Sequence, residues 1–417
     1  MAGSSGRMLQ LDVLRGAAII LVLFNHLDPA VKAGSLQPVA NWCVRFGWTG
    51  VNLFFVLSGF LVGGLLFHEL KKRGSLDIKR FLIRRGFKIW PAYYVFLVTA
   101  VSVDILVHAA DPFVTVISSL PSFAFLQGYL WPFSTRKYIW SLAVEEHFYL
   151  LLPFLLALFT KKNRQSNQQG SDVQSIPAMR IATALILVGC LILRLLSYWH
   201  EPQVFTEYQR SASHFRIDEL FFGVFLSYLY YFQSDRLAHF AVKRRKLLLL
   251  GGILLLAPMW WLEYDHPFVH TIGYCFLYLG WGSLLLALVH IKPDQSILSK
   301  LLFSPFSKVV AFVGVYSYSI FLWHYILINE PFHTLQNSIL PGLPDSLRWL
   351  LLTFAYLSMC VLSGVGMAKL IEMPSLSIRD KIFPSRASAL PSAATAGSAA
   401  NFTEPPMASP GNAEPIA

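Results

Sequence analysis

The chain has 417 residues, of which 55% are apolar and only 14% are charged, and its formal net charge is +11 at pH 7. Soluble globular domains usually carry about a quarter charged residues. Here the charge deficit is concentrated in long apolar runs, which argues against a water-soluble multidomain protein. The composition indicates an all-α, polytopic membrane protein.

Leu-rich stretches of about 20 residues recur, and each is long enough to cross roughly 30 Å of hydrocarbon. The stretch 113–132 is also apolar, but Pro112, Pro121, Gly128 and Pro132 interrupt it. We expect a re-entrant or interfacial segment there instead of a full span. The pattern predicts about ten transmembrane helices, near residues 10–28, 48–68, 87–107, 139–159, 180–199, 217–233, 246–263, 269–290, 309–328 and 348–370.

The loop charges predict the orientation of these spans. If the N-terminus is cytoplasmic, the basic clusters at 71–85, 161–180, 236–246 and 292–308 all fall in cytoplasmic loops. The loops on the other side hold few basic residues. Both termini should therefore be cytoplasmic, and the net positive charge reflects topology and attraction to anionic membrane lipids, with no nucleic-acid partner implied.

The transmembrane domain is expected to occupy residues 1–380. The tail 386–417 is rich in Ala, Ser and Pro and is expected to be disordered. The four cysteines are scattered and show neither metal-ligand spacing nor a disulfide framework, so no metal site is expected.

Charged groups inside a membrane are costly, and each one is therefore a functional hypothesis. The first apolar run contains Asp12, Arg15 and His26. On an α-helix, Arg15 and His26 differ by only about 20° in direction and lie about 16 Å apart in depth. Asp12 lies on the same side. The alternative is an Asp12–Arg15 pair that packs helices, with His26 merely hydrogen-bonded.

The segment 138–155 carries Glu145 and Glu146 beside each other as it enters the fourth span. Adjacent residues on a helix point about 100° apart, so both carboxylates are not expected to face lipid. One should meet an Arg or His of another helix, either in a site or as a structural ion pair.

The third span begins with Arg84, Arg85 and Lys88. These cations can anchor the helix at the cytoplasmic surface. They can also bind phosphate, for which Arg offers two donors in a fixed fork. Both roles are compatible.

Three polar islands interrupt the later apolar runs. Arg216 and Asp218 begin the sixth span, Tyr316 and His324 lie in the ninth, and Glu372 follows the tenth. Each island could be a structural hydrogen-bond node. Together they favour an internal polar cavity.

These motifs, in this order, resemble the integral-membrane acyltransferase 3 family. The matching segments are Arg15 and His26 with ten residues between them, GVNLFFVLSGFLVGG at 50–64, the Arg85–Lys88 pair, and the WSLAVEEHFYLLLP, RIDEL, SYSIFLWH and IEMP stretches. The sequence departs from the pattern at three positions, with Asn52 for Asp, Lys88 for Arg and His147 for Gln. Because Lys lacks the fork of Arg, phosphate binding at position 88 could be weaker or rely on Arg84.

The resemblance implies a multi-pass protein of the bacterial inner membrane. It would transfer a short acyl group from acyl-CoA to a hydroxyl of a glycan, lipid or other envelope acceptor. His26 is the natural general base or transient acyl carrier, because its pKa normally lies near physiological pH. Asp12 and Arg15 would orient the site, Arg84, Arg85 and Lys88 would hold CoA phosphates, and Glu145 would orient a partner such as His26.

Two other classes of function remain open from the residues themselves. A transporter or flippase could use the intramembrane Arg, Glu and His side chains as a relay, although no inverted repeat is evident. A purely structural membrane protein is disfavoured by the number of charges inside its spans.

Overall fold

The computed structural model describes residues 8–27, 32–130, 133–134, 137–166, 177–200, 205–327 and 342–384. These residues form helices and no strand, which confirms the all-α prediction. The expected tail 386–417 lies outside them. The helices are α1 (Leu9–Asn25), η1 (Gly34–Leu36), α2 (Gln37–Gly47), α3 (Thr49–Arg73), α4 (Ile78–Leu106), α5 (Pro112–Phe123), η3 (Lys137–Ile139), α6 (Trp140–Ser166), α7 (Pro177–His200), α8 (Phe205–Ser211), α9 (Ser213–Phe232), α10 (Ser234–Lys243), α11 (Arg245–Leu256), α12 (Pro258–Trp261), η4 (Val269–Gly273), α13 (Tyr274–Val289), α14 (Ile297–Leu302), α15 (Pro305–Val315), α16 (Ser317–Leu327), α18 (Asp345–Met367), η6 (Ala368–Glu372) and α19 (Met373–Ile382).

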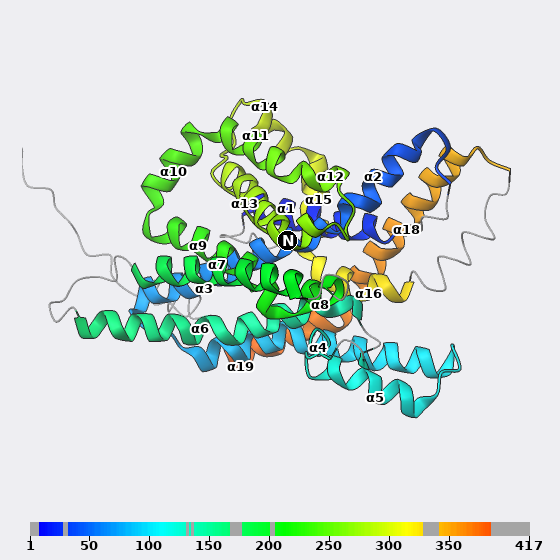
Figure 1. The fold of residues 1–417 in the computed structure, drawn as a ribbon, viewed down its shortest axis with the longest axis horizontal. Coiled ribbons are helices and arrows are strands. Elements are labelled where there is room, and N and C mark those ends of the chain that lie inside the picture. The colour runs from blue at the N-terminus through cyan, green and yellow to red at the C-terminus, as the bar shows by residue number, and fades with distance from the viewer. Residues whose placement is uncertain are drawn as a thin grey trace, which may run out of the picture.

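Helices α1 and α3 run through the middle of the bundle. In Figure 1, α4, α5, α6 and α19 lie along one side of them, and α10, α11, α13 and α14 lie along the other. Helix α3 packs most extensively against α9 and also contacts α1, α6 and α13. Its central position explains why most of its apolar side chains are buried.

The turn between α3 and α4 is specified locally by the sequence. Gly74 ends α3 with a φ of 67°, a left-handed conformation that glycine adopts without steric cost. Asp77 then caps α4, because its side chain accepts a hydrogen bond from the backbone N–H of Arg80. This short turn brings the basic end of α3 beside the basic start of α4.

Helices α3 and α9 cross at backbone contact. A Cβ added at Gly59 would lie 1.9 Å from the carbonyl oxygen of Leu220, and one added at Gly223 would lie 2.2 Å from that of Val56. Small residues at helix crossings are typical of membrane proteins, where close backbone approach replaces the hydrophobic drive for association.

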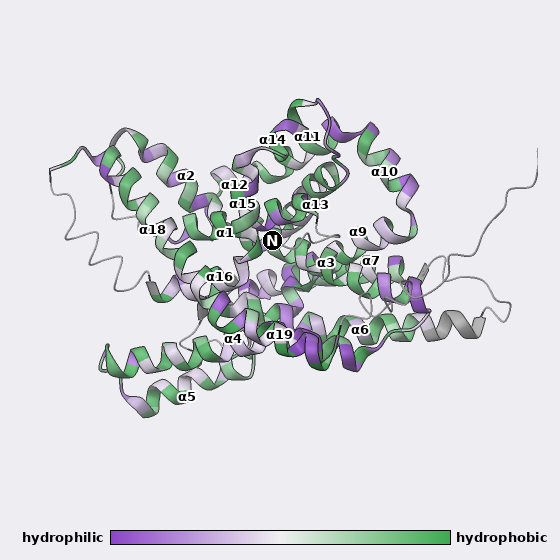
Figure 2. Cartoon of the chain, turned by 180° about the vertical axis from the view of Figure 1, so that it is seen from behind, coloured by the Kyte–Doolittle hydropathy of each residue, from purple (hydrophilic) through white to green (hydrophobic). Residues whose placement is uncertain are grey.

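Six described helices are long and apolar enough to cross a membrane. They are α3, α4, Trp140–Thr160 of α6, Ala178–His200 of α7, the continuous Val269–Val289 helix, and the continuous Asp345–Ile382 helix. The outer faces of such helices are apolar: Leu185 and Phe354 are 68% and 73% exposed. Figure 2 shows this hydrophobic character along most of the bundle and hydrophilic residues on α10 and α19.

The ninth expected span is a broken helix. Helices α15 and α16 meet at Tyr316 and are bent by 71°, so the number of candidate spans rises to seven if the pair crosses as one. Ser304 caps α15, and Pro305 occupies its first turn.

The other three expected spans also contain helices, but these are shorter or more charged. Helix α1 has 17 residues and α11 has 12, while α9 carries Arg216, Asp218 and Glu219 near its start. In the described part of the interrupted stretch, up to residue 130, the helix is α5, which has 12 residues, packs against α4 and is too short to cross roughly 30 Å.

Substitution of Gly59 by Ala should destabilise the protein, because the added methyl group meets a backbone carbonyl that cannot rotate away. Overpacking of this kind typically costs about 1–3 kcal/mol. The measurement is the apparent Tm in detergent. Gly251→Ala is the control, since a Cβ there meets nothing within 4 Å. Equal Tm values for the two variants would contradict the observed crossing.

Candidate active site

Three cavities adjoin one another through the bundle, and most of the predicted site residues line them. The central cavity has a volume of about 260 Å³, and the other two have volumes of about 400 Å³ each. Arg85 and Lys88 line both the central cavity and the second one, which we call the basic cavity. Val51, Ser141 and Phe321 line both the central cavity and the third one, which we call the His26 cavity.

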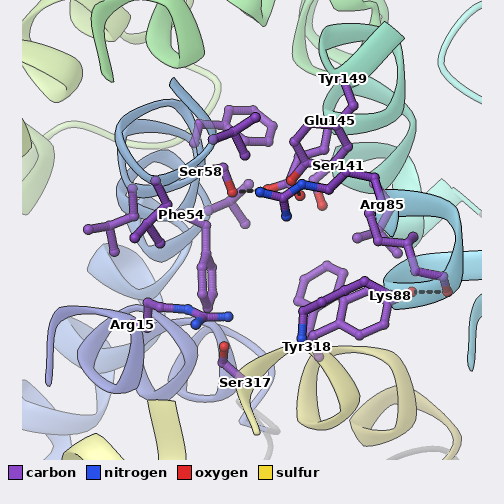
Figure 3. A pocket seen from close by; sticks show the side chains of 18 residues that line it. Arg15, Phe54, Ser58, Arg85, Lys88, Ser141, Glu145, Tyr149, Ser317 and Tyr318 are labelled. Carbon is purple, nitrogen blue, oxygen red and sulfur yellow. Dashed lines mark hydrogen bonds between the residues drawn. The ribbon is translucent and has the colours of Figure 1, made fainter. Parts of the chain in front are cut away.

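The central cavity lies where α1, α3, α4, α6 and α16 meet. The side chains of Arg15, Arg85 and Glu145 line this cavity and come from three different helices, α1, α4 and α6 (Figure 3). Its polar lining is completed by Ser58, Lys88, Ser141, Tyr149, Ser317 and Tyr318. The remaining lining is apolar, which is typical of pockets that bind small organic ligands.

Glu145 is held by two hydroxyl groups. Ser58 Oγ donates to Oε1 at 2.8 Å, and Tyr149 OH donates to Oε2 at 2.7 Å. The guanidinium of Arg85 lies over the Tyr149 ring, 5.2 Å from its centroid. Arg85 and Glu145 thus share the central cavity, whereas His26 lines the adjoining one.

Lys88 forms an ion pair with Glu372, with 2.5 Å between Nζ and Oε1. Ser319 Oγ donates to the other carboxylate oxygen of Glu372 at 2.8 Å. This network joins α4, η6 and α16, and it explains why the IEMP motif lies near a cation. The ion pair also partly neutralises the positive charge of Lys88. Because Lys lacks the guanidinium fork of Arg, Lys88 is further weakened as a predicted phosphate ligand.

The basic cavity is lined by cations from three helices. Lys72 and Arg73 come from the end of α3, Arg84 and Arg85 from α4, and Arg379 from α19. Glu69 is the only carboxylate in the described lining, so the cavity has a strongly positive electrostatic character.

His26 follows directly after the last residue of α1. Its Nδ1 lies 2.9 Å from the carbonyl oxygen of Val22. Because a carbonyl can only accept, Nδ1 is the donor, and the neutral ring carries its lone pair on Nε2. The His26 cavity also contains Asn25, Tyr138 and Arg210.

His324 lies against His26, with 5.0 Å between the ring centroids. Its Nδ1 donates to the carbonyl of Phe321 at 2.6 Å, and its buried Nε2 has no hydrogen-bond partner among the described residues. An imidazole at the end of α1 and one within α16 are thus brought together, a contact that the sequence spacing does not predict.

The RIDEL stretch forms a buried ionic network beside these cavities. Arg216 donates to Glu219 Oε1 at 3.0 and 3.2 Å, and Asn52 donates to both carboxylate oxygens of Glu219 at 3.0 Å. The Arg216 guanidinium lines the His26 cavity and stacks over Trp140 at 4.9 Å. Asn52 therefore donates to a carboxylate, a bond that an ionised Asp could not make.

Asp218 faces away from this network and pairs with Arg194 of α7 at 2.8 Å, with both side chains fully buried. Arg194 also donates to the carbonyl of Phe215 at 2.6 Å. The pair connects α7 to α9, and neither residue lines any of the three cavities. The contacts of Asp218 therefore belong to the packing of α7 on α9 and not to a cavity.

Five other candidates also lie away from the cavity linings: Asp12, Glu146, Tyr316, and the His324 and Glu372 described above. Asp12 is buried where α1 crosses α15. Glu146 is buried and accepts a hydrogen bond from Trp90 Nε1 at 3.2 Å. Tyr316 marks the break between α15 and α16, and its ring makes an edge-to-face contact with Phe312.

Three residues of these networks are not among the predicted site residues, namely Arg194, Glu219 and Ser58. Arg194 lies inside an expected span, so the rule that flagged Arg15 would have flagged it too. Glu219 belongs to the RIDEL stretch, of which only Arg216 and Asp218 are predicted as site residues. Ser58 carries no charge and gave no comparable signal. No group of His, Cys, Asp and Glu side chains that could hold a metal ion occurs among the residues described.

Residues 8–368 match the family model described as "Acyltransferase domain", which is acyltransferase 3. The chain belongs to the acyltransferase 3 family. Several apolar helices together with this membership identify a multi-pass integral membrane protein.

Among curated proteins, the chain is similar to the peptidoglycan O-acetyltransferase OatA of Listeria monocytogenes, with 28% identity over 76% of this chain and 49% of that protein. It is also 24% identical to the O-acetyltransferase OatA of Staphylococcus aureus strain NCTC 8325, over 76% of this chain and 50% of the relative. The chain thus spans about half the length of these curated relatives. No solved structure matches it.

Replacement of Asp218 by Asn should destabilise the protein strongly, because it leaves the Arg194 charge buried without its partner. Breaking a buried ion pair from one side typically costs about 3–5 kcal/mol. The measurement is thermal unfolding in detergent. The double variant Arg194→Met with Asp218→Leu should recover most of the loss. A double variant as unstable as the single one would show that the pair is not the cause.

Proposed function

We propose that this protein is an integral-membrane O-acyltransferase that uses acyl-CoA from the cytoplasm and a hydroxyl acceptor on the opposite side of the membrane. The observation that carries the proposal is the row of three adjoining cavities. A cation-rich cavity leads through Arg85 and Lys88 to a central cavity, which leads through Ser141 to a cavity containing a histidine with an available Nε2.

The basic cavity suits the nucleotide end of CoA. Its arginines offer bidentate donors to phosphate, and Arg85 continues this positive lining into the central cavity. His26 lies eleven positions after Arg15, at the end of α1, which corresponds to about 16 Å of helix. An extended pantetheine arm covers a distance of that order, so the thioester can approach His26 while the phosphates remain in the basic cavity.

His26 is assigned as the general base. Its Nε2 takes the proton of the acceptor hydroxyl, and the oxygen attacks the thioester carbonyl. Collapse of the tetrahedral intermediate breaks the C–S bond, and the CoA thiolate leaves with the proton from the His26 imidazolium. The products are an ester and CoA. The hydrogen bond from Nδ1 to Val22 keeps the ring in the tautomer that this step requires.

Arg15 and Glu145 are assigned to the central cavity as groups that orient the donor arm. Arg15 supplies positive charge, and Glu145 fixes Tyr149 and Ser58 at the wall. Asp12, buried one helical turn from Arg15, would support the position of α1 without touching substrate.

A glycan is the favoured acceptor class, because the relatives named above include a peptidoglycan O-acetyltransferase. The transferred group is then acetyl or another short acyl group. We further propose ten spans with both termini in the cytoplasm of a bacterial cell, which would place the basic cavity inside and the His26 cavity toward the envelope.

The competing transporter hypothesis has one structural feature in its favour, the broken helix α15–α16. Family membership favours acyl transfer. Incorporation of radiolabelled acetyl groups from acetyl-CoA into membranes separates the two, since a transporter moves its substrate without forming an ester.

His26→Ala should lower the rate of acyl transfer by about 10²–10⁴-fold, the usual contribution of a general base. The protein should still accumulate in membranes, because His26 closes only the last turn of α1. Turnover is measured with purified protein and acetyl-CoA. His290→Ala provides a control, since that histidine lies at the end of α13 and lines none of the three cavities. Near-normal turnover of the His26 variant would make this residue structural.

Acetyl-CoA supplied only on the cytoplasmic side of sealed vesicles should label an acceptor confined to the other side. The reason is that one row of cavities connects the two proposed binding regions. Vesicles of known orientation and a membrane-impermeant glycan acceptor make the measurement. Labelling that requires both substrates on the cytoplasmic side would contradict the cross-membrane route.

A further inference from the structure

Helix α19 closes one side of the basic cavity, although it lies beyond the family match, which ends at residue 368. It continues α18 and η6 as one helix from Asp345 to Ile382. A helix of 38 residues is about 57 Å long, whereas the hydrocarbon core is roughly 30 Å thick. A helix of this length that crosses the membrane extends beyond the hydrocarbon core, and we place its charged last turn, with Arg379 and Asp380, in the part outside.

Asp380 occupies the space between two arginines of the basic cavity. Arg379 donates to both of its carboxylate oxygens at 2.9 Å, and Arg84 of α4 pairs with it at 3.2 Å. A carboxylate clasped by two guanidinium groups has the contacts that a phosphate would make there. The carboxylate is half-exposed, so its ion pairs are weak and can be exchanged.

The end of the same helix occupies further donors of α4. Arg84 also donates to the carbonyl of Phe383, and Arg80 donates to the carbonyl of Pro384. Ser375 holds α19 against α4 by donating to the carbonyl of Phe87 at 2.6 Å. The helix is thus fixed near its start, while its end is held through arginine side chains that line the basic cavity.

We propose that α19 is part of the donor site: Arg379 binds a phosphate of the nucleotide, and Asp380 is an internal competitor that leaves Arg84 when the donor binds. This inference rests on the proposed use of acyl-CoA and adds residues to that site. Arg85 shares the central cavity with Glu145 but forms no ion pair within 4.0 Å with the residues described; its guanidinium lies over the rings of Phe81 and Tyr149, so it can receive a phosphate without breaking a direct ion pair. Arg84 can receive one only after Asp380 has moved.

Substitutions of Arg379 and Asp380 are expected to change the affinity for CoA in opposite directions. In Asp380→Asn the competing charge is absent, and CoA should bind about twofold to fivefold more tightly. In Arg379→Gln a phosphate ligand is lost while Asp380 remains on Arg84, and CoA should bind about fivefold to tenfold more weakly. If α19 only held Arg84 in place, both variants would weaken binding.

The measurement is isothermal titration of the purified full-length protein in detergent with CoA, and with pantetheine as a probe that lacks the nucleotide phosphates. Asp235→Asn and Arg236→Gln are matched controls, because these adjacent, exposed residues of α10 do not line the basic cavity. The controls should bind CoA as the wild type does, and pantetheine binding should not respond to any of the four substitutions.

Unchanged or weaker CoA binding by Asp380→Asn would overturn the inference, and so would unchanged binding by Arg379→Gln. If CoA binding is lost on Arg85→Gln in the same experiment, the proposed donor site stands even when the inference about α19 fails. If the wild type binds CoA no more tightly than pantetheine, the proposed donor itself is wrong, and the inference falls with it.

Discussion

Charged side chains within an apolar bundle remain there only where the protein supplies opposite charge, hydrogen bonds or a polar cavity. This constraint divides the ionic groups of the molecule into two sets. Arg194 with Asp218 is fully buried and connects α7 to α9. Arg15 and Glu145 instead line a cavity. Lys88 belongs to both sets, because it lines two cavities and is paired with Glu372. The buried pair holds helices together, whereas the proposed chemistry is assigned to the groups that line cavities.

Helix α3 connects these two functions of the bundle. Gly59 allows α9 to approach at backbone contact, so the RIDEL network comes close enough for Asn52 to bind Glu219. Other positions of the same helix, Val51 and Ser58, form walls of the central cavity. A change in the α3–α9 crossing would therefore move the cavity wall as well as the helix interface, which links stability to the geometry of the site.

The sequence predicts the helical architecture well, because apolar run length and turn residues such as Gly74 and Asp77 are local signals. It also flags Arg15, Arg85 and Glu145, because each lies in or beside an apolar run, but their meeting in one cavity is known only from the structure. It could not give their partners. The contacts of His26 with His324 and of Lys88 with Glu372 join segments about 300 residues apart, and depend on how the helices cross. The expected spans likewise correspond to long, uninterrupted apolar helices at six places, whereas α1 and α11 are shorter and α9 carries charges near its start.

The position of His26 at the end of α1 has a chemical consequence that follows from the helix itself. The last carbonyl groups of a helix have no intrahelical donor, and His26 supplies one to Val22 through Nδ1. The bond that completes the helix end thus also leaves Nε2 as the basic nitrogen. The partial negative charge at a helix C-terminus stabilises a neighbouring imidazolium, typically by about 0.3–1 kcal/mol and up to about 2 kcal/mol when partly buried. A histidine one turn earlier in α1 would have its backbone neighbours already paired, and neither effect would act on the proton that the proposed reaction transfers.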